Sequence, residues 1–437
     1  MFRLTVPMIF GMISMMLLGV VDTYFISMLG THELAAVSFS QPIANILISV
    51  ALGIGMALGA LLSRLIGESQ HQKAARFITD TKIIAALIAV IAAFIGFLAI
   101  DPLFKALGAT EEVMPFIKSY MSIWFIAAPM WMLTMIGNNA LRAIGDTKLS
   151  ASIMALLSVI NLIFDPLLIF GIGPFPKLGV AGAAWATLIA CMTGWLCSIA
   201  ILTFREQLLE FTRPSFSHLL PNWFELFKIA VPAIAANIMT PIAAAVLTAM
   251  IARYGVEAVA GFGVGARIEF ISLIVVFALS STLPMFIGQN IGAGKPHRAY
   301  RALMGGLKFS LIFQTGVYLL LLATSGYIAS VFSDNSQVVG VIKMFLLVLP
   351  LTYGAHGIVI LVMVSLNVLR RPRTALLTTV VRLLLLYLPL AYIGSLLGGI
   401  NGLFIGAACG NIIAGLIAYA IIRRVFREQG ITALETG

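Results

Sequence analysis

Long apolar segments separated by short polar connections run along nearly the whole chain. A helix needs about 20 apolar residues to cross the hydrocarbon core of a bilayer. The segments do not alternate between apolar and polar positions, as the strands of a membrane barrel would. We therefore predict an all-α integral membrane protein with twelve transmembrane helices, at residues 4–28, 34–63, 80–100, 114–137, 149–170, 180–203, 224–252, 258–287, 303–325, 338–367, 375–394 and 401–422.

The composition supports a membrane protein. Only 10% of the 437 residues are charged, against about 25% in soluble domains, and the mean hydropathy is +1.06. The three cysteines all lie inside apolar segments, at spacings that match no disulfide framework or metal site. We therefore expect no cofactor, and no metal beyond a coupling ion.

The basic residues lie mainly on one side of the predicted membrane. Of the 27 lysines and arginines, 21 fall in or near the connections on one side, and only five lie on the other. The basic side is expected to be cytoplasmic, which places both termini there. The net charge of +10 therefore reflects membrane orientation and contact with anionic lipids, and we expect no nucleic-acid partner.

The sequences of the two halves of the chain are related by an internal repeat with a constant offset of 225 residues. "LTVP" at 4–7 matches "IAVP" at 229–232, and "IGESQHQKAAR" at 66–76 matches "IGAGKPHRAYR" at 291–301. We predict two pseudo-symmetric six-helix lobes in a parallel repeat, at 1–203 and 224–437, joined by a cytoplasmic linker at 204–223. Such repeats are typical of transporters with the substrate site between the halves. Duplication in a channel or a structural protein is the alternative.

Two acids lie inside predicted helices of the first half, where the second half has leucines. Asp22 and Asp165 lie about 9 and 8 Å from the outer ends of their helices, and Thr187 lies about 10 Å from its own. Asn161 is one turn from Asp165 on the same helix face. This depth-matched set predicts a proton or Na⁺ site, since hard cations prefer oxygen ligands. The alternative is that each acid makes only a local hydrogen bond between helices.

Prolines lie in both acid-bearing helices. Pro7 and Pro166 each remove one backbone hydrogen bond, which bends a helix or frees a carbonyl. We predict that they bend their helices, and that the bend at Pro7 changes with the charge of Asp22.

Other polar and aromatic residues are candidates for a substrate cavity. Trp131 and Met135 offer an aromatic face and an adaptable thioether to organic cations, and Asn139 lies one turn further on. Lipid-facing or packing roles are the alternative for each of them. Glu269 either attracts cationic substrates or forms a buried pair.

The chain resembles the multidrug and toxic compound extrusion (MATE) family over its whole length. The resemblance lies in "GVVDTYFISMLGTHELAAVS" at 19–38, "NALRAIGDTK" at 139–148, "NLIFDP" at 161–166, "GVAGAAWAT" at 179–187 and "PMFIGQNIGAGKPHRA" at 284–299. It implies two lobes arranged in a V, and the two acids are most similar to those of the DinF-like branch.

The resemblance also implies the residues of the coupling site. The family's first-lobe ion site maps onto Asp22, Asn161, Asp165 and Thr187, with the Ala183 carbonyl as a further ligand. Met15 is a departure, because some relatives have a glutamine near that position.

We therefore predict a secondary active antiporter in the bacterial cytoplasmic (inner) membrane. It would export hydrophobic, often cationic small molecules in exchange for H⁺ or Na⁺ by alternating access, and we expect it to be a monomer rather than an enzyme. A flippase for lipid-linked precursors, of the same superfamily, is the first alternative. An intramembrane enzyme that uses the two acids is the second, although no nucleophile or metal cluster accompanies them.

Overall fold

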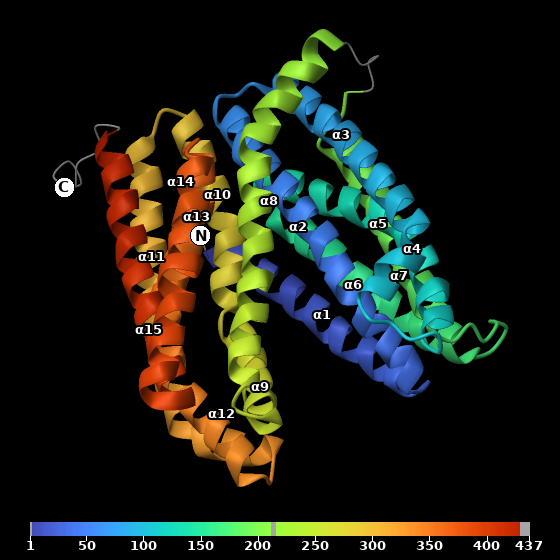
Figure 1. The fold of residues 1–437 in the computed structure, drawn as a ribbon. Coiled ribbons are helices and arrows are strands. Elements are labelled where there is room, and N and C mark those ends of the chain that lie inside the picture. The colour runs from blue at the N-terminus through green and yellow to red at the C-terminus, as the bar shows by residue number, and fades with distance from the viewer. Residues whose placement is uncertain (1, 211–215, 429–437) are drawn as a thin grey trace. The chain divides into compact units, whose positions relative to one another are not determined.

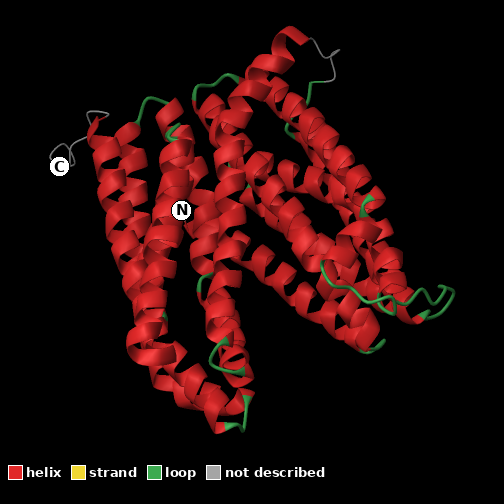
Figure 2. Ribbon diagram, in the orientation of Figure 1, coloured by secondary structure: helices red, strands yellow, loops and turns green. Residues whose placement is uncertain are grey.

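A computed structural model of the chain describes residues 2–210 and 216–428, which are almost entirely helical (Figures 1 and 2). Residues 211–215 of the predicted linker and the last nine residues lie outside the described part. Within the described ranges there is no strand, and eleven segments are long and apolar enough to cross a membrane. The longest segment, Pro372–Glu428, breaks at Gly398 and Gly399 and so makes two passes. The predicted all-helical membrane protein with twelve passes is confirmed.

Contacts between residues divide the chain into two compact units, Met1–Val231 and Pro232–Gly437. The helices of the first unit are α1 (Phe2–Ser27), α2 (Thr31–Gly67), α3 (His71–Leu98), α4 (Ile100–Ala106), α5 (Met114–Ile144), α6 (Thr147–Phe170), α7 (Val180–Ala200) and the π-helix η1 (Ile201–Arg205). The boundary between the units falls inside α8 (Phe216–Ala252), so this helix belongs to both.

In the first unit, α1 packs on α6, α6 on α7, α7 on α5, and α5 on α2 and α3. The contact between α6 and α7 depends on Gly182, because a Cβ atom there would lie 2.5 Å from the carbonyl of Leu168. The backbone N–H of Leu178 also donates to that carbonyl, at 2.9 Å. These contacts hold the first turns of α7 against the end of α6, which brings Ala183 and Thr187 alongside Asp165.

The helices of the second unit are interrupted more often by breaks and by 3-10 or π-helical turns. Its elements after α8 are α9 (Val256–Ser272), α10 (Ile274–Gly292), α11 (Pro296–Phe332), α12 (Ser336–Val348), η2 (Pro350–Thr352), α13 (Tyr353–Val368), α14 (Pro372–Val380), the π-helix η3 (Val381–Tyr387) and α15 (Leu388–Glu428). Gly399, at φ 61° and ψ −145°, reverses the chain within α15. A residue with a Cβ atom rarely adopts that conformation.

The repeat found in the sequence is also present in the helix boundaries. The helix pairs α1 and α8 end at Ser27 and Ala252, and α2 and α9 begin at Thr31 and Val256. The same offset of 225 separates the ends of α2 and α10 and the beginnings of α3 and α11. In both halves a glycine of positive φ, Gly30 or Gly255, precedes the second helix. The two halves therefore share one local fold.

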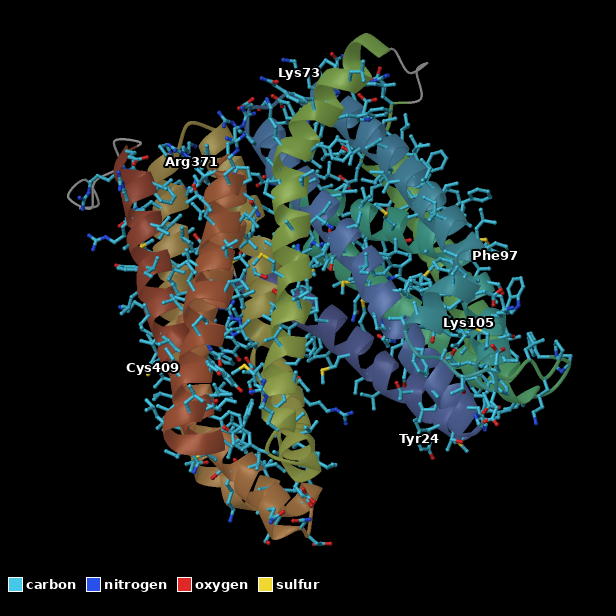
Figure 3. All side chains as sticks on the ribbon, in the orientation of Figure 1. Tyr24, Lys73, Phe97, Lys105, Arg371 and Cys409 are labelled. Atoms are coloured by element: carbon cyan, nitrogen blue, oxygen red, sulfur yellow. The ribbon has the colours of Figure 1, made fainter. Side chains whose placement is uncertain are left out.

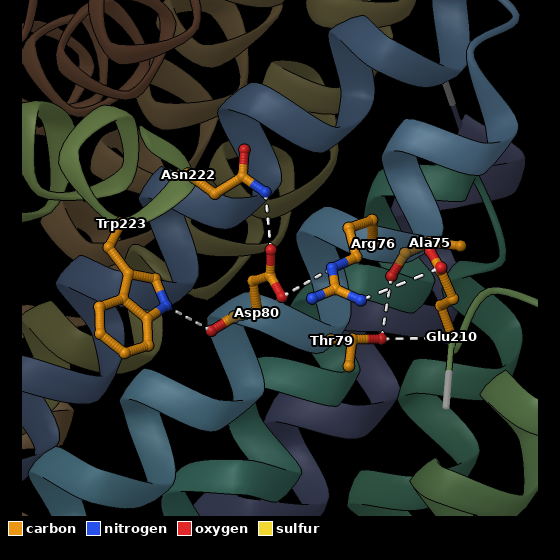
Figure 4. Close-up of polar contacts among 7 residues, drawn as sticks. All are labelled: Ala75, Arg76, Thr79, Asp80, Glu210, Asn222 and Trp223. Atoms are coloured by element: carbon orange, nitrogen blue, oxygen red, sulfur yellow. Dashed lines mark hydrogen bonds and ion pairs between the residues drawn. The ribbon is translucent and has the colours of Figure 1, made fainter. Parts of the chain in front are cut away.

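The largest difference from the predicted spans is at α3, which begins at His71 rather than at residue 80. Its first turns are polar, yet Asp80 is fully buried. Figure 4 shows the reason: Arg76 Nε lies 3.1 Å from the Asp80 carboxylate, and the Asn222 amide donates to it at 2.7 Å. Trp223 Nε1 donates to the Asp80 carbonyl at 2.9 Å. The start of α8 is thereby attached to α3, inside the first unit.

The preceding connection is attached to the same helix. The backbone N–H of Glu210 donates to Thr79 Oγ1 at 3.0 Å, and the Glu210 carboxylate lies 3.9 Å from Arg76 (Figure 4). The described part of the linker is therefore held against the first unit and does not hang free.

The outward surface of α3 is apolar, as expected of a helix that contacts lipid. Leu87, Ile91, Phe94 and Leu98 are each about half exposed or more, and they recur at the helical spacing of three to four residues. In Figure 3, Lys73 marks the end of the first unit that holds the basic connections, and Tyr24 lies toward its opposite end. The exposed apolar band therefore lies between two polar ends.

Candidate functional site

Four helices of the first unit enclose a cavity of about 180 Å³ beside the acids. Its lining is mainly apolar, with a few polar groups. It is formed by Met15, Leu18, Gly19 and Asp22 of α1; Trp131, Thr134, Met135 and Asn138 of α5; Met154, Leu157 and Asn161 of α6; and Thr187, Ala190 and Cys191 of α7.

Asp165 is fully buried and is linked to the cavity through Asn161. The Asn161 amide nitrogen faces Asp165 and donates to its Oδ2 at 2.6 Å, while the amide oxygen faces Thr187 Oγ1 at 3.2 Å. The opposite orientation would put the amide oxygen against two carboxylate oxygens, which repel it. The Thr187 hydroxyl lies 3.0 Å from the Ala183 carbonyl, its other acceptor. The structure thus brings Asn161, Asp165, Thr187 and Ala183 into one hydrogen-bonded group.

Asp22 reaches the same cavity from α1. One of its carboxylate oxygens, Oδ1, is buried and has no hydrogen-bond partner among the described residues. Its charge acts on Asp165, and both acids act on the buried Tyr120 of α5. A buried anionic oxygen without a donor is costly unless it is protonated or binds a cation. Asp22 is therefore the group of this cavity that protonation or a bound cation would satisfy.

The oxygens of this group could hold a proton or a hard cation, and the orientation of Asn161 bears on the choice. The orientation of Asn161 turns an N–H toward Asp165, so its oxygen is directed away from the two carboxylates. A Na⁺ ion between the acids would need oxygen ligands on that side.

Two of the three cavity candidates on α5 line this cavity. Trp131 and Met135 do so, whereas Asn139 does not. The Asn139 oxygen accepts from Arg142 at 2.7 Å, and its amide packs against Gly55 of α2. Its neighbour Asn138, which sequence reasoning missed, lines the cavity with both amide atoms unpartnered among the described residues.

Tyr120 was also missed. It lies six residues, or about 9 Å, from the start of α5, which is the depth of the acids in their own helices. Its position in the sequence therefore could have indicated that Tyr120 lies at the level of the two acids.

Pro7 and Pro166 both lie inside continuous helices, α1 and α6. Pro166 follows Asp165 directly, so the carbonyl of Leu162, one turn earlier, lacks its usual helical donor. The change of bend at Pro7 with the charge of Asp22 stays a prediction.

Glu269 lies in the second unit, on α9. Its carboxylate is 3.5 Å from His356 Nδ1 of α13, and Arg382 of η3 lies 2.7 Å from the other ring nitrogen. Glu269 thus lies in a polar group formed within the second unit, beside His356.

Comparisons with known proteins identify relatives over nearly the full chain. The MatE family model matches residues 7–167 and 232–393, once in each half. A protein named FAD transporter, from Shewanella oneidensis, is 41% identical over 434 residues, which cover 99% of this chain and 96% of that protein. Multidrug export protein MepA of Staphylococcus saprophyticus is 26% identical over 97% of this chain and 92% of its own.

The fold is also similar to a solved structure. The Vibrio cholerae MATE transporter VcmN in the bent form has a TM-score of 0.93 at 31% identity, covering 98% of this chain and 96% of that one.

Proposed function

Because the chain belongs to the MATE family of membrane transporters, we propose that it is a proton-coupled antiporter that exports a flat aromatic solute, with flavin adenine dinucleotide as the first candidate. We place it in the bacterial cytoplasmic membrane with both termini inside. Asp22 and Asp165 would carry the coupling proton. The observation that carries the proposal is the unpartnered carboxylate oxygen of Asp22 at the wall of an otherwise apolar cavity.

Coupling follows from competition for the same cavity. With Asp22 charged, the cavity attracts a cation or a hydrogen-bond donor, and protonation removes that attraction. A proton and a substrate that prefer different states of one site shift its equilibrium in opposite directions. Asn161 would relay the change to Asp165, because its amide bonds that carboxylate while lining the cavity.

The substrate proposal rests on the relative named FAD transporter, which is 41% identical to this chain. Trp131 supplies an aromatic face for stacking on a planar ring. At about 180 Å³, the cavity is smaller than the roughly 300–1,000 Å³ typical of pockets for drug-sized ligands. It would therefore hold one part of a dinucleotide, and other groups must bind the rest.

Hydrophobic cations are the second candidate substrate. Relatives named for multidrug export are 26–28% identical to this chain, and an acid beside Trp131 and Met135 suits an organic cation.

Transport in proteoliposomes tests both candidates. Flavin adenine dinucleotide and a fluorescent cationic dye would be measured separately, under an imposed pH gradient or an imposed Na⁺ gradient. The variants are Asp22→Asn and, as a matched control, Asp101→Asn, whose carboxylate is half exposed and pairs with Lys118. We expect transport of the flavin driven by the pH gradient alone, abolished in Asp22→Asn and unchanged in Asp101→Asn.

The other results would overturn parts of the proposal. If transport requires a Na⁺ gradient, the coupling ion is Na⁺ and not the proton. If Asp22→Asn transports at the wild-type rate, Asp22 has no coupling role. Export of the dye without the flavin would select the second candidate.

A further inference from the structure

The second unit contains an unusual group of charged and phenolic side chains, which we call the Arg382 cluster. It comprises Glu269 of α9, Tyr353 and His356 of α13, and Arg382 and Tyr387 of η3. Arg382 Nη2 lies 2.7 Å from His356 Nε2, and His356 Nδ1 lies 3.5 Å from Glu269. The charge of Glu269 acts on both tyrosine hydroxyls, and that of Arg382 acts on Tyr387.

The contact between Arg382 and His356 defines the state of the ring. A guanidinium can only donate, so the lone pair of His356 Nε2 must accept. The ring is then neutral, with its proton on Nδ1, facing Glu269. Arg382 is thus paired to a neutral acceptor, and none of the described carboxylates lies within ion-pair distance of it.

Several donors in the cluster are unused. Arg382 Nε and the hydroxyl of Tyr353 are buried without a hydrogen-bond partner among the described residues, and Tyr353 is only 1% exposed. The charge of Glu269 acts on Arg382 from beyond ion-pair distance, but a buried guanidinium N–H or hydroxyl without a hydrogen-bond partner is still costly. Both donors need an acceptor, and an oxyanion offers several acceptor oxygens and suits a guanidinium.

The location of the cluster in the helices favours a transported solute over a lipid headgroup. Arg382 is ten residues, or about 15 Å, from the start of α14, and His356 is twelve residues, or about 18 Å, from the end of α13. Headgroups lie outside a hydrocarbon core about 30 Å thick. Arg382 also lies in a π-helical turn, a distortion that is frequent at functional sites.

We propose that the Arg382 cluster is an anion site that binds a phosphate group of the exported solute, with Arg382 and the Tyr353 hydroxyl as donors. The inference rests on the proposed function, since the diphosphate of a flavin dinucleotide would supply the anion. On binding, Arg382 exchanges the neutral His356 ring for an oxyanion, the ligand that its planar fork prefers. Glu269 holds the ring in place and opposes the anion by its charge.

Binding of related ligands to the purified full-length protein tests the site. Flavin adenine dinucleotide, riboflavin and adenosine diphosphate separate the phosphate from the ring system, because riboflavin lacks phosphate and the diphosphate lacks the flavin. The protein would be held in nanodiscs of phosphatidylcholine alone, and then in nanodiscs with added phosphatidylglycerol. The variants are Arg382→Gln, Glu269→Gln, Tyr353→Phe and the control Arg424→Gln, whose side chain is 83% exposed.

We expect Arg382→Gln to weaken binding of both phosphate ligands by about 10- to 100-fold, which corresponds to the loss of a charged hydrogen bond. The same variant should weaken binding of riboflavin by less than about twofold. Glu269→Gln should strengthen binding of the phosphate ligands, because it removes a repelling charge. Tyr353→Phe should weaken it by a smaller factor, and Arg424→Gln should change nothing. A purely structural role would not give opposite effects at Arg382 and Glu269.

Other outcomes separate this inference from the proposed function. Suppose that wild type transports the flavin dinucleotide, but Arg382→Gln weakens binding of the dinucleotide and of riboflavin equally, or weakens binding of neither. The anion site is then wrong, and the antiporter proposal stands. If wild type binds adenosine diphosphate through Arg382 but no flavin, the anion site stands and the flavin proposal is wrong. An effect seen only with phosphatidylglycerol would assign the site to lipid and overturn it.

Discussion

The buried carboxylate of Asp80 provides a direct test of what attaches α8 to the first unit. Asp80→Asn keeps the shape of the side chain but removes its charge, which leaves Arg76 without its main counter-charge. Removing one partner of a buried ion pair costs about 3–5 kcal/mol. Arg76 is 13% exposed and lies 3.9 Å from Glu210, so we expect the lower end of that range.

Asp101→Asn is the matched control. Asp101 pairs with Lys118 at 2.7 Å, which is closer than the Asp80 pair, but both side chains are about half exposed. An exposed pair contributes only about 0–1 kcal/mol. The same substitution should therefore lower the free energy of unfolding by about 2–3 kcal/mol more at position 80 than at position 101.

Denaturant titration of the purified protein in mixed micelles, followed by tryptophan fluorescence, measures that difference. Arg76→Gln should recover part of the loss when it is combined with Asp80→Asn, because the double variant leaves no buried charge unpaired. Equal losses at positions 80 and 101 would refute the reasoning, since burial would then not determine the cost.

Three further predictions concern single positions. Gly182→Ala should destabilise the protein by about 1–3 kcal/mol in the same titration, because its Cβ atom would meet the backbone of α6, whereas Gly59→Ala has open space and should be neutral. Gly399→Ala should cost about 1–3 kcal/mol because of its positive φ, and the adjacent Gly398→Ala, at φ −141°, should cost less. Trp131→Ala should raise the dissociation constant for riboflavin about tenfold through lost stacking, and Trp131→Phe should largely restore it; equal binding by Trp131→Ala would exclude that contact.

The spans were predictable because a bilayer imposes one length on every helix that crosses it. The start of α3 was not, since hydropathy treats Asp80 as a solvated acid. Its partners Asn222 and Trp223 lie more than 140 residues away in the chain. The break at Leu273 was also invisible to hydropathy, because apolar residues continue through it, whereas the break at Gly399 falls in the predicted connection between residues 394 and 401.

The acids of the site were predictable from depth alone, since helix rise converts position into distance. Rotation about the helix axis was harder to infer. Asn138 and Asn139 differ by about 100° around α5, and only the packing of α2 and α7 decides which one lines the cavity. The orientation of the Asn161 amide depends on contacts between helices, which no local pattern encodes.

The common offset of the helix boundaries bears on how this protein arose. Six passes return a chain to the side from which it started, so one half made alone would insert in the same orientation as the other. Two separately made halves could therefore have paired as identical subunits before their genes fused. Identical subunits must carry identical residues, whereas a fused chain need not. The aspartates at positions 22 and 165, which align with leucines in the second half, are an asymmetry that two identical subunits could not have.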